Sequence, residues 1–160
     1  MEIIQPEAVS TGIKFGRFGI IAATLSLIAS EASLAELNRR LKEKGKDILP
    51  MSRFRPNIVI KGTTPFIEDR MKVIQIGEAI LYVVSSCPRC KESCTDQMTG
   101  IVTEEPVVTM RDFRCISPND PDSVFFAVNA IPAIGSIGKK IRVGDAVKVI
   151  QWGEPAYSDP

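Results

Sequence analysis

Histidine is absent from the 160 residues of this sequence. The chain therefore has no imidazole for a catalytic triad, for acid–base chemistry near neutral pH or for a histidine-ligated zinc site. Any metal must be bound through sulfur or through the ligands that a cofactor brings with it. The length predicts one domain, large enough to bury a hydrophobic core without covalent crosslinks.

The sequence also lacks an excess of charge, because it has 20 lysine and arginine residues and 19 aspartate and glutamate residues. A net charge of +1 gives no indication of binding to nucleic acid or to an anionic membrane. Two short basic runs, residues 39–42 and Lys139-Lys140, are interpreted as solvated faces. Nucleic acid is therefore not expected among the partners.

A clear membrane span is also missing. The mostly apolar run at residues 18–29 has twelve residues, whereas a transmembrane helix needs about 20. Lys14 and Arg17 precede this run and small residues end it, which are the proportions of a signal peptide. We favour the alternative, a buried strand at residues 25–30. We have no interpretation of residues 1–24.

Three of the four cysteines lie within eight residues, in the sequence Cys87-Pro-Arg89-Cys90 and at Cys94. Thiolates are soft metal ligands and strong nucleophiles, and an adjacent arginine favours the ionised form. The cluster therefore predicts a metal, cofactor or redox site. It also differs from the spread spacing of a secreted disulfide framework, so we expect an intracellular reducing compartment, cytoplasmic or mitochondrial. The isolated Cys115 is expected to be a buried small hydrophobic residue.

Short β-like runs separated by glycine turns dominate the rest of the chain. The predicted strands are residues 57–61, 73–76, 79–84, 124–129, 140–143 and 146–150. The last two are expected to form a hairpin around Gly144-Asp145. A short helix is predicted at residues 106–113, and the tail from Gly153 is expected to be loose. No glycine-rich phosphate motif supports a dinucleotide fold. The expected fold class is mainly β with a few helices (α+β), arranged as a β-barrel.

A first helix is predicted from a capping box. Ser33-Leu-Ala-Glu36 has the spacing in which a serine and a glutamate cap the same helix start. Leu37 and Leu41 lie on one face of this helix, and Gly45 is expected to end it.

Several motifs, taken in order, resemble the MOSC domain, the C-terminal domain of molybdenum cofactor sulfurases that also occurs in amidoxime-reducing molybdenum enzymes. The motifs are residues 33–39, 54–60, 66–69, 76–77, 87–90, 96–100, 105–106 and 141–145. The resemblance implies a MOSC domain at residues 28–151, an atypical segment at 1–27 and a tail at 152–160. It also implies a β-rich barrel, in agreement with the strand pattern. Family members normally carry another β-rich domain before this one, which contributes to the cofactor and substrate pocket.

The resemblance also implies a molybdenum–pyranopterin cofactor. Cys90, the second cysteine of the pair, is implied as the catalytic metal ligand, because a soft thiolate completes a coordination whose other sulfurs belong to the cofactor. Arg55, Asn57 and Arg89 are implied as cofactor-binding residues, since arginine binds phosphate in a planar fork. The alternative for Arg55 and Asn57 is a satisfied loop-to-strand turn. The alternative for Cys90 is an inert buried thiol.

Pro88 and Cys94 are among the positions that depart from the family pattern. Pro88 occupies a place where the family usually has serine, which removes a hydroxyl and a backbone N–H. Cys94 adds a third thiol, which could pair with Cys87 or Cys90 or form a zinc-like cluster with both. Asp96, Glu68 and Asp69 are the available general acids. As turn residues, they are expected mostly at the surface.

Three functions stay open. The first is a molybdenum-dependent oxidoreductase that takes electrons from haem and flavin partner chains and reduces N-hydroxylated substrates. The second is a non-catalytic cofactor-binding or sulfur-carrier module of the sulfurase type, whose partner would be a cysteine desulfurase domain holding pyridoxal phosphate. The third is an inactive fragment with a thiol or zinc cluster.

Overall fold

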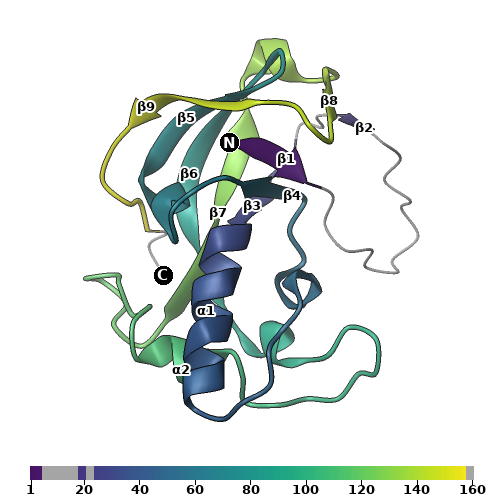
Figure 1. Ribbon diagram of the computed structural model, residues 1–160. Helices are drawn as coiled ribbons and strands as arrows, with labels where there is room; N and C mark the ends of the chain where they lie inside the picture. The colour runs from purple at the N-terminus through teal and green to yellow at the C-terminus, as the bar shows by residue number, and fades with distance from the viewer. Residues whose placement is uncertain (5–17, 21–23, 158–160) are drawn as a thin grey trace.

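A computed structural model describes residues 1–4, 18–20 and 24–157. The largest element of the described chain is a curled seven-stranded sheet with the order β1-β4-β3-β7-β6-β5-β9 (Figure 1). Along the chain, its strands are β1 (Glu2–Ile4), β3 (Ser26–Ser30), β4 (Ile58–Lys61), β5 (Met71–Ile76), β6 (Ala79–Arg89), β7 (Val124–Pro132) and β9 (Val147–Trp152). A second, two-stranded sheet pairs β2 (Phe18–Ile20) with β8 (Lys140–Arg142). The prediction of a mainly β fold with a few helices is confirmed.

The edges of the large sheet approach one another at one end. Glu2 of β1 forms an antiparallel bridge with Ala146, which lies immediately before β9. The N–H of Val147 also donates to the carbonyl oxygen of Met1 at 2.9 Å. The sheet therefore curls into a half-barrel rather than lying flat.

One connection in this sheet is parallel, between β3 and β4, and a helix makes the crossover that such a connection needs. This helix, α1 (Glu31–Glu43), packs Leu37 and Leu41 into the core. The second helix, α2 (Val107–Arg111), contacts α1 and β7. The part of the chain that the structure describes also contains four single turns of 3-10 helix: η1 (Met51–Phe54), η2 (Ile67–Arg70), η3 (Lys91–Cys94) and η4 (Ile134–Ser136).

Two hydrophobic clusters hold these layers together. The first lies among the strands of the curled sheet and includes Ile28, Ile60, Ile74 and Leu81, all fully buried. The second contains residues from α1, α2, η1, β3, β4 and β7. Its centre includes Phe54, whose ring stacks on Phe126 with centroids 3.9 Å apart.

The start of α1 differs from the capping-box prediction. Ser30 is the N-cap, and its hydroxyl accepts a hydrogen bond from the N–H of Ala32 at 3.1 Å. Ser33 is buried, and its hydroxyl oxygen accepts from the N–H of Phe66 at 2.8 Å. Glu36 accepts hydrogen bonds from Arg39 and Arg40 instead of capping the helix. The capping-box prediction was wrong because Ser33 lies on the face of α1 that packs against the η2 region.

The C-terminal hairpin prediction was also wrong. Residues around Gly144-Asp145 do reverse the chain, but β8 pairs with β2 whereas β9 pairs with β5. The predicted strands at residues 73–76 and 79–84 correspond to β5 and β6, which form a hairpin around Gly77-Glu78. The predicted strand at residues 25–30 corresponds to β3, while Lys14 and Arg17 lie outside the described residues.

Contacts extend into the tail beyond β9. The N–H of Ser86 donates to the carbonyl oxygen of Ala156 at 2.6 Å, and Tyr157 packs edge-on against Phe125. Residues 153–157 therefore lie against the sheet, although the tail was expected to be loose. Among the described residues, no helix is both long and apolar enough to cross a membrane.

Candidate functional site

The thiol cluster lies at the end of β6, one of the central strands of the sheet. Cys87 and Arg89 belong to this strand, and Cys90 follows it directly before η3. The register between β6 and β7 is irregular from Ser86 to Pro88, which is where a bulge can redirect side chains and accommodate proline. Cys90 is exposed and Cys87 is half-buried. Cys90 is therefore exposed to solvent at the junction between β6 and η3.

Arg89 lies beside these thiols and is held by backbone carbonyl groups. Its Nε and Nη2 donate to the carbonyl oxygen of Phe126 at 2.9 and 2.7 Å, and its Nη1 donates to that of Phe54 at 3.3 Å. No carboxylate among the described residues pairs with this guanidinium. Burial lowers the pKa of Arg89, whereas negative charge on Cys87 and Cys90 raises it. The arginine therefore places a positive charge that an anion beside Cys90 would neutralise.

Arg55 lies near the same loop in a strained backbone conformation. Its φ of 52° and ψ of 45° are left-handed, which is unusual for a residue other than glycine. Its guanidinium is exposed, and Nη1 is 4.0 Å from a carboxylate oxygen of Glu92 in η3. Strain of this kind persists only where surrounding contacts impose it, and it is concentrated at functional sites. The structure thus brings Arg55, Arg89 and Cys90 together around η1, η3 and the end of β6.

Asn57 has a different environment. Its side-chain oxygen accepts a hydrogen bond from the N–H of Leu27 at 2.7 Å, and its own N–H donates to the carbonyl oxygen of Leu27 at 2.9 Å. These two bonds join the start of β4 to β3. These contacts give Asn57 a place in a loop-to-strand turn, and they use its side-chain oxygen and its backbone N–H.

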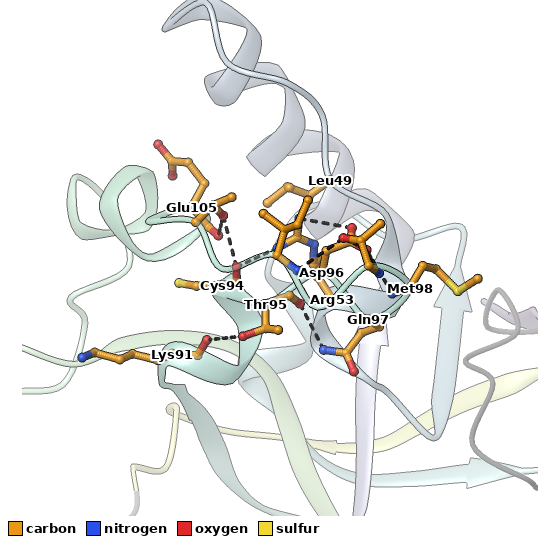
Figure 2. A network of polar contacts seen from close by, with 12 residues as sticks. Leu49, Arg53, Lys91, Cys94, Thr95, Asp96, Gln97, Met98 and Glu105 are labelled. Atoms are coloured by element: carbon orange, nitrogen blue, oxygen red, sulfur yellow. Dashed lines mark hydrogen bonds and ion pairs between the residues drawn. The ribbon is translucent and has the colours of Figure 1, made fainter.

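A buried arginine that the sequence motifs did not identify holds the loop after Cys90. Arg53 in η1 donates from Nη1 to the carbonyl oxygen of Cys94 at 2.9 Å, and its Nη2 is 3.4 Å from Oδ2 of Asp96 (Figure 2). Its Nε is buried without a partner. The only signal in the sequence was its position one residue before the Phe54 motif. Sequence position does not show which of two neighbouring arginines is buried.

Asp96 organises the turn that follows. Its Oδ1 accepts from the N–H groups of Met98 and Thr99, both at 2.9 Å, and from the Thr99 hydroxyl at 3.0 Å. These backbone and side-chain hydrogen bonds lower the pKa of Asp96. The carboxylate of Asp96 therefore holds the turn in place through Oδ1, and its other oxygen, Oδ2, faces Arg53.

The four cysteines are all free thiols. Cys94 is buried and directs its Sγ to the carbonyl oxygen of Glu104, 3.5 Å away. Within the described part of the chain, no group of three cysteine, aspartate or glutamate residues could hold a metal ion. The geometry thus gives no support to a zinc cluster of Cys87, Cys90 and Cys94. Cys115 is exposed, so the prediction of a buried residue there was wrong.

Glu68 and Asp69 are buried, contrary to the expectation of surface carboxylates. Oε1 of Glu68 accepts a hydrogen bond from the hydroxyl of Ser33 at 2.6 Å, while Oε2 has no partner. Burial raises the pKa of Glu68 to about 7, against the opposing effect of the Ser33 hydrogen bond. Asp69 pairs with Arg114 at 2.8 Å, and burial also raises its pKa.

Arg114 links the buried carboxylate of Asp69 to β7, the strand that pairs with the thiol-bearing end of β6. Its Nε donates to the carbonyl oxygen of Phe125 at 2.6 Å, and Phe125 is the β7 partner of Pro88. Its guanidinium also lies 4.2 Å from the centre of the Phe66 ring. Arg53, Arg89 and Arg114 therefore each donate to a backbone carbonyl group, either in the loop after Cys90 or in the β7 strand paired with the end of β6.

Comparison with known proteins identifies similar sequences. Residues 17–148 match the MOSC domain family. Mitochondrial amidoxime reducing component 2 of Rattus norvegicus is 38% identical over 126 residues, which cover 75% of this chain and 35% of that protein. Molybdenum cofactor sulfurase of Caenorhabditis briggsae is 41% identical over 122 residues, which cover 76% of this chain and 16% of that protein. The chain thus spans about a third or less of the length of these relatives.

A solved structure is also similar, that of YiiM from Geobacillus stearothermophilus. It aligns with 79% of this chain and 54% of its own at 12% sequence identity, with a TM-score of 0.47. The family assignment therefore rests on the sequence matches and not on this structural similarity.

Proposed function

Because the chain belongs to the MOSC domain family, we propose that it binds a molybdenum–pyranopterin cofactor and reduces N-hydroxylated substrates, with Cys90 as the protein ligand of the metal. The observation that carries this proposal is the exposed thiol of Cys90 next to the guanidinium of Arg89, which has no carboxylate partner among the described residues. A thiolate is a suitable ligand for a soft metal, and the charge of Arg89 favours an anionic group at this place.

The donor set around Cys90 fits such a cofactor. Arg55 is exposed on the side of η3, and its planar fork suits a phosphate group. Arg89 is fixed by three hydrogen bonds to carbonyl oxygens, so it would orient an anion without first becoming ordered. When bound, the cofactor supplies a metal that changes oxidation state. The residues of the chain supply its attachment, its orientation and the positive charge around it.

Two observations reduce the number of residues that we propose to contact the cofactor. The side-chain oxygen of Asn57 is bonded to Leu27, so Asn57 contributes to the site by fixing the start of β4 rather than by accepting from the cofactor. Cys94 is buried with its sulfur directed to Glu104, so Cys90 is the thiol of this loop that remains accessible.

The partners follow from the chemistry of a reductase. Reduction of an N–OH bond consumes electrons and protons and releases water, so the reaction requires an electron donor. We propose haem and flavin proteins for this role, as the family resemblance implies. We propose an intracellular reducing compartment, because it would keep the thiols free. The similarity to mitochondrial amidoxime reducing components supports the mitochondrion as this compartment.

Metal and pterin content tests the proposal. Full-length protein from a host that makes the cofactor is expected to carry molybdenum, the Cys90→Ser variant is expected to lose it, and Cys115→Ser is expected to retain it. Cys115 is a matched control because it is also an exposed free thiol. Molybdenum absent from all three proteins, or retained in Cys90→Ser, would contradict the proposed ligand.

A second function deserves the same test because of the similarity to molybdenum cofactor sulfurase. In this case the domain would hold the cofactor without reducing a substrate, and a cysteine desulfurase domain with pyridoxal phosphate would be its partner. Loaded protein supplied with an electron donor distinguishes the two functions. Reduction of benzamidoxime supports the reductase, whereas molybdenum content without reduction supports the binding module.

A further inference from the structure

An exposed segment between β7 and β9 combines apolar and basic side chains. Residues 134–143 contain no aspartate or glutamate. Ile134 has 90% of its surface exposed, Ile137 has 46% and Val143 has 47%. Ile134 has the highest exposure of the large hydrophobic residues in the described part of the chain.

The backbone holds this apolar surface outward. The hydroxyl of Ser136 accepts a hydrogen bond from the N–H of Ile80 at 2.8 Å, and Ser136 is buried. Ile134 begins η4 and Ile137 follows its last residue, with the N–H of Ile137 donating to the carbonyl oxygen of Ile134 at 3.3 Å, so the two exposed isoleucines lie on either side of this anchor. A Cβ atom added at Gly135 or Gly138 would meet no other atom within 4 Å. The segment therefore protrudes from the fold.

Basic side chains lie directly beside the isoleucines. In β8, Ile141 is buried while Lys140 and Arg142 are exposed on the opposite face of the strand. Lys139 donates from Nζ to the backbone carbonyl oxygen of Glu78 at 2.9 Å, a contact that leaves its charge in place. The nearest acid along the chain, Asp145, accepts from the backbone N–H of Arg142. Asp145 and the exposed Glu78 thus accompany the three basic side chains of the segment, and the surface keeps a small excess of positive charge.

This surface is remote from the thiol loop. The segment contacts the beginning of β6 through Ile80, whereas Cys87 and Arg89 are at the other end of this eleven-residue strand. Figure 1 shows β8 at one end of the molecule and α2, which contacts η3, at the other. An occupant of residues 134–143 would therefore leave Cys90 accessible.

We propose that residues 134–143 dock the protein on an anionic lipid bilayer. Protruding aliphatic side chains next to lysine and arginine match a membrane interface, where the aliphatic tips enter the headgroup region and the cations contact anionic lipids. Long basic side chains can extend to the charged surface while their stems remain in apolar surroundings.

Vesicle sedimentation with the full chain tests this proposal. Binding is expected to vesicles of phosphatidylcholine with phosphatidylserine, and to be much weaker with phosphatidylcholine alone. Arg142→Glu is expected to lower partitioning roughly tenfold, and added salt to lower it further. Ile134→Ser with Ile137→Ser is expected to lower it by a similar factor, because the apolar contact is lost.

Two substitutions elsewhere serve as matched controls. Ile150→Ser removes an apolar side chain that is 50% exposed on β9, and Lys46→Glu reverses an exposed charge after α1. Both are expected to bind vesicles like the unaltered protein. Absence of binding to anionic vesicles, or equal loss in test and control variants, would overturn the proposal. So would self-association in sedimentation velocity that Ile134→Ser abolishes, because this result assigns the surface to a second copy of the chain.

Discussion

Arg53 donates a hydrogen bond from Nη1 to the carbonyl oxygen of Cys94 over 2.9 Å, and thereby joins two segments that are 41 residues apart in the sequence. The bond connects η1, which precedes Arg55, to η3, which follows Cys90. Both sides of the candidate site are therefore fixed through one buried guanidinium. The positions of η1 and η3 at the candidate site therefore depend on Arg53, whose side chain is buried.

Replacement of Arg53 by methionine is expected to destabilise the fold. Methionine fills much of the space, but it removes one donor from the carbonyl group of Cys94, which retains its bonds from Thr103, and the positive charge that faces the carboxylate of Asp96. We expect a loss of about 2 kcal/mol in the free energy of unfolding, measured with urea. Arg39→Met is the control, because Arg39 forms only exposed ion pairs on α1 and should change stability by about 0.5 kcal/mol or less. An equal loss of unfolding free energy in both variants would show that the hydrogen bond from Arg53 to Cys94 contributes no more than an exposed ion pair.

Cysteine labelling is expected to separate the thiols by accessibility. A maleimide reagent should modify the exposed Cys90 and Cys115 rapidly in the native protein, and the buried Cys94 only after unfolding. Mass spectrometry of the digested protein locates each modification. Rapid native labelling of Cys94 would contradict its burial in the loop.

The sequence was sufficient to predict the strands whose patterns depend on their own residues. The β5–β6 hairpin is an example, since apolar strands flank the glycine turn at Gly77. It did not predict that β8 and β9 would pair with different strands, because a turn at Gly144-Asp145 fixes a chain reversal and not the partners beyond it. Pairing between distant strands depends on the whole sheet.

For the candidate site, too, the sequence predicted some features and missed others. A cysteine pair next to an arginine is visible in the sequence, and the structure places Arg89 and Cys90 together at the end of β6. Burial is not visible in the sequence, which is why Arg53, Glu68 and Arg114 were missed or misjudged. Charged residues are usually exposed, and the exceptions depend on partners far away in the chain.

Arg55 provides a test of backbone strain. Its φ of 52° is readily adopted by glycine and is unfavourable for a β-branched residue. Arg55→Gly is expected to stay within about 1 kcal/mol of the parent in stability, whereas Arg55→Val should lose about 1 to 2 kcal/mol. Thermal unfolding of the two variants measures the difference, and both lack the arginine charge. Equal midpoints for glycine and valine would show that residue 55 is not held in the left-handed region.

Glu68 is expected to make stability depend on pH. Its pKa in the folded protein is about 7, above the ordinary value of 4.5 expected in the unfolded chain. Between these values the folded state retains the proton and the unfolded state releases it, so the free energy of unfolding falls as pH rises. Below about pH 4.5 this contribution is fully present, and above pH 7 it is lost. The change from pH 5 to pH 8 should be roughly 2 to 3 kcal/mol.

Substitution of Glu68 by glutamine isolates this contribution, because glutamine resembles the protonated carboxyl group and stays neutral. Urea unfolding at several pH values should give Glu68→Gln a stability close to that of the parent at pH 5 and a higher stability at pH 8. Glu104→Gln, at an exposed position, controls for the loss of one carboxyl group. If the parent and Glu68→Gln proteins change equally with pH, Glu68 is ionised in the folded state. The buried Oε2 oxygen without a partner must then have a water molecule or another donor beside it.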